Sequence, residues 1–241
     1  MTWSIVARDA SGAFGVAVAS KFFAVGALCP HAASGIGALS TQAIVNPLYA
    51  PAALDAMARN EDPVDIVRML MRADPGHDHR QLHLIDRAGR IAAHTGAACI
   101  DWCGHRAGAD YSLAGNMLAG PRVLDDTAAA YAANSALPFA ERLIVAMEAG
   151  DAAGGDKRGK QAAALVVYAT EVYPVLDLRV DDHAEPIMEL HRLYDVSLER
   201  FQPFVACLPS AHDPQGITDR AVIEAQIARF QTTRKRRPGP G

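Results

Sequence analysis

The fold is decided by the first 21 residues of the chain, which read MTWSIVARDASGAFGVAVASK. Apolar side chains alternate with small or polar ones over residues 3–7 and again over residues 14–18, a pattern typical of β-strands. The segment Asp9-Ala10-Ser11-Gly12 between them has the composition of a turn, so the stretch predicts an antiparallel hairpin. Both faces of this hairpin carry apolar or small side chains, and we expect both to be buried.

The register of the hairpin decides which side chains lie near Thr2. A two-residue loop at residues 10–11 would place Trp3 opposite Val18 and gather the large apolar side chains on one face. A slip by one residue would place Trp3 opposite Ala19 and divide that apolar set. We expect the first register, which puts Lys21 diagonal to Thr2 on the face of small residues, within reach of a lysine side chain.

The rest of the chain alternates between strand and helix patterns. Strands are expected at residues 35–45, 81–86, 90–95, 111–118, 161–168 and 175–180, and helices at 48–57, 64–70, 123–149, 185–201 and 219–231. Asp62 and Pro63 are typical of the cap and first position of a helix, and Asp74-Pro75-Gly76 of its end. This order predicts an α+β protein with two stacked sheets and helices outside. We expect one domain over residues 1–200 and an extension over 201–241 with one helix and a basic, solvated Pro/Gly tail that contains Arg234-Lys235-Arg236-Arg237.

Composition excludes several classes of protein. Half of the 241 residues are hydrophobic and 21% are charged, so a packed core is expected rather than disorder. The formal net charge is −4, which disfavours a general nucleic-acid binder. No segment has the roughly 20 apolar residues of a membrane span, and the N-terminus lacks the pattern of a signal peptide, so we expect a cytoplasmic protein without membrane contact. The four cysteines are too few for a disulfide scaffold, and Cys99 and Cys103 have no second pair of metal ligands nearby.

A threonine at position 2 could serve as a catalytic nucleophile. Removal of Met1 would leave the hydroxyl and a free α-amine on one residue, and that amine titrates near pH 7.7–8.0, so it can act as a general base at neutral pH. Threonine with its own terminal amine is a known activated nucleophile. A lysine ammonium such as that of Lys21 would lower the pKa of the amine further. Many proteins have threonine at this position, so the position alone does not indicate catalysis.

Several further motifs support a catalytic role for Thr2. The N-terminal hairpin is followed by Thr41-Gln42-Ala43, Gly115-Asn116-Met117-Leu118, Gly154-Gly155-Asp156-Lys157-Arg158-Gly159-Lys160-Gln161 and Arg179-Val180-Asp181-Asp182-His183. Together these motifs resemble the uncharacterised prokaryotic family called domain of unknown function 1028, placed with the N-terminal nucleophile (Ntn) hydrolases, over residues 1 to about 195. The resemblance implies a four-layer αββα sandwich of two antiparallel sheets and hydrolysis of an amide bond. It supplies no substrate.

The resemblance also implies roles for single residues. Thr2 matches the position of the nucleophile, and Lys21 resembles the lysine that proteasome-type members keep beside their threonine. Asn116 would donate its amide to an oxyanion, or it is an ordinary turn residue after glycine. Ser4 and Ser20 would relay protons and contact substrate, or they cap strand ends.

The glycine-rich segment over residues 154–161 is the most polar of these motifs. Its glycines would let the backbone approach a ligand, with Asp156 and Arg158 recognising a substrate amine or carboxylate. The alternative is an ordered loop or a dimer contact. Because the segment lacks the order of a nucleotide-binding P-loop, ATP is not expected.

Histidine clusters offer little evidence for a metal. In Asp181-Asp182-His183 only the first and third side chains would share a face of a strand, so a structural ion pair or an interface is the expected role. His77-Asp78-His79 follows a helix end and is expected in an exposed loop, and His105 is a candidate pocket residue. We expect no metal and no cofactor.

Two functions from different classes fit these observations. The first is an amidohydrolase that cleaves a small-molecule or short-peptide amide through an acyl-enzyme on Thr2. The second is a catalytically silent Ntn-like fold that binds a small ligand or serves as a homo-oligomeric scaffold. In both cases a homo-oligomer, most simply a homodimer, is expected.

Overall fold

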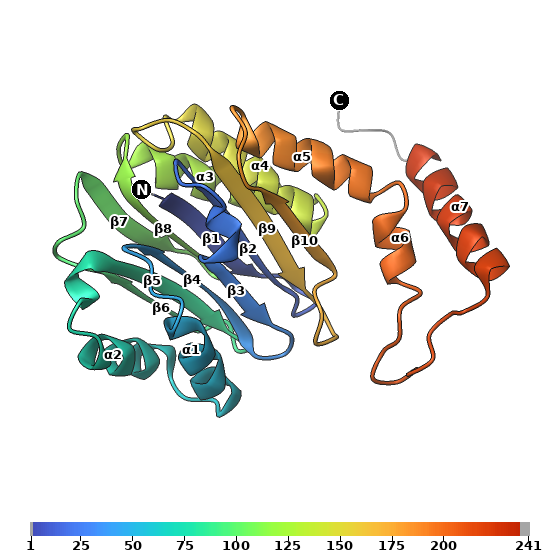
Figure 1. Ribbon diagram of the computed structural model, residues 1–241, viewed down its shortest axis with the longest axis horizontal. Coiled ribbons are helices and arrows are strands. Elements are labelled where there is room, and N and C mark those ends of the chain that lie inside the picture. The colour runs from blue at the N-terminus through green and yellow to red at the C-terminus, as the bar shows by residue number, and fades with distance from the viewer. Residues whose placement is uncertain (1, 237–241) are drawn as a thin grey trace. The chain divides into compact units, whose positions relative to one another are not determined.

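A computed structural model describes residues 2–236 and contains two antiparallel β-sheets. The larger sheet has six strands in the order β10-β9-β2-β1-β8-β7, and the smaller has four in the order β3-β4-β5-β6 (Figure 1). The strands are β1 (Thr2–Arg8), β2 (Phe14–Ser20), β3 (Pro30–Ala33), β4 (Gly37–Ala43), β5 (Arg80–Asp86), β6 (Ile91–Thr95), β7 (Trp102–Ala107), β8 (Tyr111–Leu118), β9 (Ala162–Tyr168) and β10 (Leu176–Val180). The helices are α1 (Tyr49–Ala58), α2 (Pro63–Ala73), α3 (Arg122–Ala133), α4 (Phe139–Ala152), α5 (Pro186–Ser197), α6 (Phe201–Val205) and α7 (Arg220–Arg236), with short 3-10 helices at Val25–Ala27 and His77–His79.

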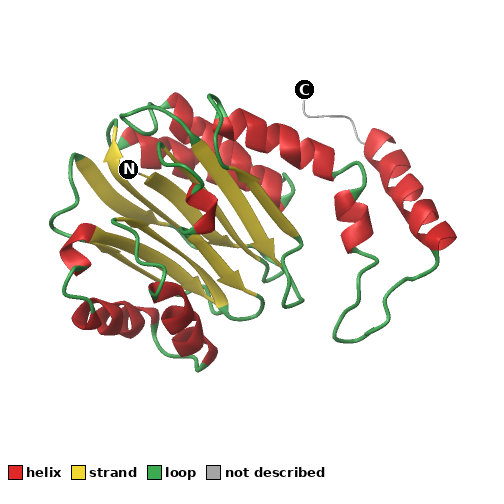
Figure 2. Ribbon diagram, in the orientation of Figure 1, coloured by secondary structure: helices red, strands yellow, loops and turns green. Residues whose placement is uncertain are grey.

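The two sheets are stacked, and helices cover the outer face of each (Figure 2). Helices α3 and α4 pack on the six-stranded sheet, whereas α1 and α2 pack on the four-stranded sheet. The expected α+β class with two stacked antiparallel sheets and outer helices is therefore confirmed.

The central strands β1 and β2 are buried on both faces because they lie between the helices and the second sheet. On one face Gly15 lies against Leu143 and Phe139 of α4. On the other, Val6 and Phe14 belong to an apolar cluster between the sheets, which also contains Val16, Ala38, Ile85 and Val166. The burial expected for both faces of the hairpin is confirmed.

The expected register of the hairpin is wrong by one residue. Thr2 pairs with Ser20 and Trp3 with Ala19, because residues 9–13 form a loop longer than a two-residue turn. The carboxylate of Asp9 accepts hydrogen bonds from the amides of Ser11 (2.8 Å) and Ala13 (2.9 Å), and this stabilises the longer loop. A pattern of apolar side chains selects a register only where one face is buried, and here both are.

The chain divides into two compact units, Met1–His191 and Arg192–Gly241. The boundary lies inside α5, upstream of the expected residue 200, and the second unit contains α6 as well as α7. Within that unit the guanidinium of Arg200 forms an ion pair with Glu224 (2.6 Å). The solvation expected for the basic run at residues 234–237 concerns side chains that lie outside the described residues. No helix within residues 2–236 has the length and apolar character needed to cross a bilayer.

Candidate functional site

Thr2 begins the central strand of the larger sheet. It lies between β2 and β8, opposite Ser20 on one side and Asn116 on the other. Its hydroxyl donates a hydrogen bond to the Ser20 hydroxyl at 3.2 Å, and the residue is 5% exposed. Three of the residues singled out in the sequence therefore meet at the start of β1.

The carbonyl of Thr2 is held by two carboxamides. Nδ2 of Asn116 and Nε2 of Gln42 each donate to the Thr2 oxygen at 3.4 Å. The same two nitrogens donate to Oε1 of Gln81, at 3.1 Å and 2.8 Å respectively. Gln42 lies in the four-stranded sheet and Asn116 in the six-stranded sheet, so this contact joins the two sheets at the candidate site.

The polar array continues inward from Thr2 along the same face of β1. The Ser4 hydroxyl donates to Oε1 of Gln42 at 2.7 Å and lies 2.8 Å from Nε2 of His83, whose Nδ1 lies 3.0 Å from the Ser112 hydroxyl. Since the single proton of Ser4 goes to Gln42, Nε2 of His83 donates to Ser4, and Nδ1 accepts from Ser112. Burial lowers the pKa of His83 to about 3, so the imidazole is neutral. Ser4 has no exposed surface, and its hydroxyl lies in the interior rather than at a substrate surface.

Lys21 does not have the contacts that the sequence led us to expect. Its side chain is exposed, its ammonium donates to the carbonyl of Lys160 at 3.1 Å, and its amide donates to Oδ2 of Asp156 at 2.7 Å. The register that was expected to bring Lys21 diagonal to Thr2 is not the one observed. Lys21 is therefore not in the position from which it was expected to tune the Thr2 amine.

Asp156 anchors the glycine-rich loop to the ends of two strands. Its buried carboxylate accepts from the amides of Lys21 and Arg158 (2.8 Å) and pairs with the Arg158 guanidinium (3.3 Å). A β-bridge connects Asp156 to Leu118 at the end of β8. Gly154, Gly155 and Gly159 have positive φ angles, so the loop depends on glycine at these turns. These contacts agree with an ordered loop, the alternative left open by the sequence.

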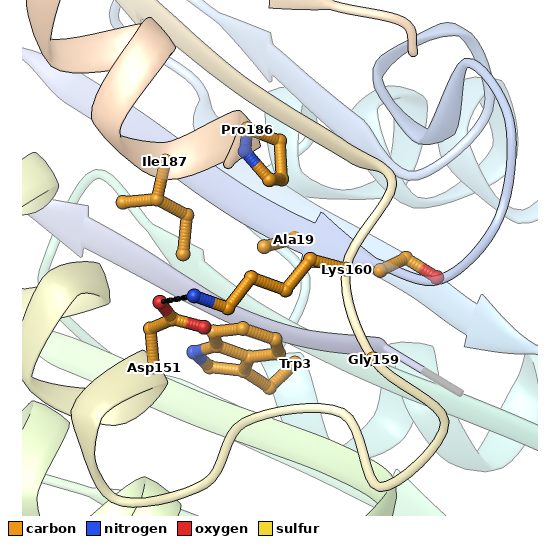
Figure 3. Close-up of a pocket in the computed structure, with 8 residues that line it drawn as sticks. Trp3, Ala19, Asp151, Gly159, Lys160, Pro186 and Ile187 are labelled. Carbon is orange, nitrogen blue, oxygen red and sulfur yellow. Dashed lines mark ion pairs between the residues drawn. The ribbon is translucent and has the colours of Figure 1, made fainter. Parts of the chain in front are cut away.

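A small pocket lies between the glycine-rich loop and the start of α5 (Figure 3). The ammonium of Lys160 crosses it to Asp151 (2.7 Å) and also pairs with Glu185 (2.6 Å). Burial alone would lower the pKa of Lys160, but its hydrogen bonds to the two carboxylates raise that pKa above its usual value. The pocket is lined by Trp3, Ala19, Ser20, Asp151, Gly159, Lys160, Pro186 and Ile187. Ser20 thus belongs both to this lining and to the contact with Thr2.

The remaining sequence candidates have structural partners. Asp181 pairs with Arg179 at 2.9 Å, and Nδ1 of His183 accepts from the amide of Glu185 at 3.0 Å. His105 lies on the exposed part of β7, and its Nδ1 lies 3.1 Å from the Thr95 hydroxyl. Within residues 2–236 no group of three or more acidic, histidine or cysteine side chains could hold a metal ion.

Gln42, Gln81 and His83 were not predicted as site residues. A signal was present, because Gln81 and His83 alternate with Leu82 and Leu84, placing two polar side chains on one face of a buried strand. Buried polar groups are hydrogen-bonded in native proteins, so such a face implies polar partners elsewhere.

The chain is similar to proteins of one family. A model for a family of unknown function, DUF1028, matches residues 2–190. The crystal structure of protein SPO2555 from Silicibacter pomeroyi, assigned to DUF1028, is similar with a TM-score of 0.83 and 30% identity, over 90% of this chain and 99% of that one. Anbu (ancestral beta-subunit) from Yersinia bercovieri has a TM-score of 0.38 and 14% identity, over 81% of this chain and 94% of that one. No curated protein matches.

Proposed function

The chain belongs to DUF1028, a family of unknown function, and we propose that it is an Ntn-type amidohydrolase whose nucleophile is Thr2. The observation that supports this proposal is the position of Thr2 at the start of a central strand. Its hydroxyl is bonded to Ser20, and its carbonyl is bonded to two carboxamides from different sheets. The proposal includes an Ntn-like sandwich, and the observed layers of helices and sheets are compatible with that fold.

The proposed reaction begins after removal of Met1. The Thr2 oxygen bonds to the amide carbon of the substrate, and its proton passes to the Thr2 α-amine, directly or through Ser20. The C–N bond then breaks as that proton moves to the leaving nitrogen, and an ester remains on Thr2. Water hydrolyses the ester, which releases the acid and restores the hydroxyl. Asn116 is the side chain we assign to the oxyanion: the N–H that makes its longer contact, to the Thr2 carbonyl, would turn to the oxyanion as it forms, while Gln42 keeps its hydrogen bond to that carbonyl.

The substrate is a small-molecule or short-peptide amide, and the reaction uses no cofactor. Of the two loop residues singled out in the sequence, we assign Arg158 to a charged group of the substrate, because its side chain is 42% exposed. Asp156 is buried and holds the loop in place. Lys21 has no assigned role in this reaction.

A second function is favoured by one observation. Thr2 is only 5% exposed, which is little for a group that must meet a substrate. This fits the alternative of a catalytically silent fold that binds a ligand elsewhere or acts as a homo-oligomeric scaffold.

Covalent labelling separates the two functions. We expect the intact mass of the purified protein to show loss of Met1, and a β-lactone acylating probe to add one acyl group on Thr2. Thr2→Ala should not be labelled, and Thr2→Ser should be labelled. Thr41→Ser is the matched control and should be labelled as wild type is. Thr41 is also a buried threonine, but its hydroxyl bonds to the Asn46 carbonyl and not to Ser20. A protein that retains Met1, or loses it and is not acylated, would favour the scaffold.

A further inference from the structure

We propose that Gln81 is a positioning residue for Thr2: it holds the carboxamides of Gln42 and Asn116 against the Thr2 carbonyl and so orients the candidate nucleophile. The effect on catalysis rests on the proposed function, whereas the effect on the Thr2 backbone does not. Gln42 occurs in a motif that resembles the family but has no role in the reaction above, and Gln81 occurs in none of the motifs.

Three carboxamides meet at this point from three different strands. Gln42 lies on β4, Gln81 on β5 and Asn116 on β8, and none of the three is more than 2% exposed. Oε1 of Gln81 accepts from both other amides, at 2.8 Å and 3.1 Å, which uses both of its lone pairs. The two donor nitrogens lie 3.4 Å from the oxygen of Thr2, one from each sheet.

The contacts of Nε2 determine which way the side-chain amide of Gln81 is turned. Nε2 of Gln81 has three acceptors for its two hydrogens, the carbonyls of Gly115 (2.9 Å) and Gly104 (3.0 Å) and the Thr95 hydroxyl (2.9 Å), so one hydrogen is shared between two of them. Carbonyl oxygens only accept hydrogen bonds, so a flipped amide would set oxygen against oxygen. Oε1 must therefore face Gln42 and Asn116, and those residues must in turn present their NH₂ groups, which lie beside Thr2.

This arrangement acts on the atoms that the proposed reaction needs. The carbonyl carbon of Thr2 is bonded to the Cα that carries both the amine and the hydroxyl side chain. Fixing the carbonyl from two sides sets the direction of both groups, and Ser20 then orients the hydroxyl. Displacement of a reacting group by about 1 Å can cost on the order of 100-fold in rate. Burying polar groups is costly unless every one is paired, so an apolar cluster would be the simpler way to stabilise the core.

The first test measures acylation of the processed protein by the β-lactone probe as a maximal rate and a half-saturating concentration. Gln81→Met should lower the maximal rate by about tenfold or more and leave the half-saturating concentration unchanged. The matched control is Thr41→Val, which removes the hydrogen bonds of an equally buried side chain on β4 that lies outside the array around Thr2. It should keep the wild-type rate. A folded Gln81→Met protein with the wild-type rate would overturn the inference.

A conservative variant adds a readout that packing alone would not change. A buried glutamic acid tends to remain protonated, and then it has the shape of glutamine with one donor and one acceptor. Measured relative to wild type at the same pH, the acylation rate of Gln81→Glu should therefore be close to that of wild type at low pH and fall below it as the pH rises through the pKa of the new carboxyl group. A flat pH profile relative to wild type would argue against positioning.

The second test is independent of activity. Hydrogen exchange of the N-terminal peptide that contains Thr2 should be faster in Gln81→Met than in wild type, and unchanged in Thr41→Val. If wild-type Thr2 is not acylated, the proposed function fails, and this exchange experiment alone decides whether Gln81 holds Thr2. Equal exchange in wild type and Gln81→Met would overturn the inference. If Gln81→Met does not fold, Gln42→Leu removes one of the two donors to Thr2 and is judged by the same measurements.

Discussion

His83 shows how strongly a single residue depends on its surroundings. Both ring nitrogens bond to serine hydroxyls, and the imidazole has no exposed surface. Burial, with a smaller contribution from the charge of His105, lowers the pKa of His83 to about 3 from an ordinary value of 6.5. The folded protein therefore does not take up the proton that this histidine accepts in the unfolded chain.

This difference predicts a loss of stability in mild acid. Between pH 6.5 and about 3 the unfolded state binds one more proton at His83 than the folded state, so the free energy of unfolding falls as the pH falls. The contribution is about 1.4 kcal/mol per pH unit. Denaturant unfolding at several pH values between 4.5 and 7 should show a steeper dependence for wild type than for His83→Gln. Equal slopes would show that His83 does not cause the effect.

At the scale of elements, α4 depends on close contact with the neighbouring helix α3 and with strand β1 of the sheet beneath it. A Cβ atom added to Gly150 would overlap the Thr127 hydroxyl oxygen and lie 2.9 Å from Nε1 of Trp3. Alanine is favoured over glycine within helices by roughly 1 kcal/mol, but overpacking of a core costs about 1–3 kcal/mol. The steric term should dominate because Thr127 and Trp3 are themselves buried.

We therefore predict that Gly150→Ala lowers the melting temperature, although it places a better helix former in the helix. Thermal unfolding followed by circular dichroism measures this. Gly120→Ala is the matched control, since no atom lies within 4 Å of its added Cβ, and it should leave the melting temperature nearly unchanged. An increase in stability for Gly150→Ala would show that the helices move apart at little cost.

The elements that could be predicted from the sequence are those with local signals. Helix α2 begins after Asp62, whose carboxylate accepts from the Val64 amide at 2.9 Å, and its first residue is Pro63, as expected. Strands β3 and β7 were not predicted because both are edge strands with weak apolar alternation. The helix expected over residues 123–149 is two helices, α3 and α4, separated at residues 134–138.

The candidate site could be predicted only in part, because its contacts are between residues far apart in the chain. The bond between Asn116 and the Thr2 carbonyl spans 114 positions, and no local rule specifies such a distance. The resemblance of the motifs indicated Thr2, Ser20 and Asn116 as site residues, and these three residues lie together in the structure. The register that misplaced Lys21 was a geometric inference, and it failed because it assumed a turn shorter than the Asp9 loop.

At the scale of the whole molecule, the expected homo-oligomer stays a prediction. Two-fold homodimers are the commonest soluble assemblies. The loop after β2 carries two exposed aromatic side chains, Phe22 (52%) and Phe23 (62%), and exposed apolar groups of this kind often mark contact surfaces. Analytical ultracentrifugation at micromolar concentration should give a mass of about twice 25.6 kDa. A single species at the monomer mass would contradict the prediction.

The central position of the β1–β2 hairpin in its sheet also has a consequence while the chain is being synthesised. Strands β1 and β2 leave the ribosome before the other strands, and their neighbours β8 and β9 lie at residues 111–118 and 162–168. At a synthesis rate of about 5–20 residues per second, the hairpin waits roughly 7–30 seconds for its last neighbour. The free edge of β1 has no partner until residues 111–118 emerge, and the free edge of β2 has none until residues 162–168 emerge. A chaperone that binds unpaired strands would therefore find the hairpin that carries Thr2 available for most of the synthesis of this sheet.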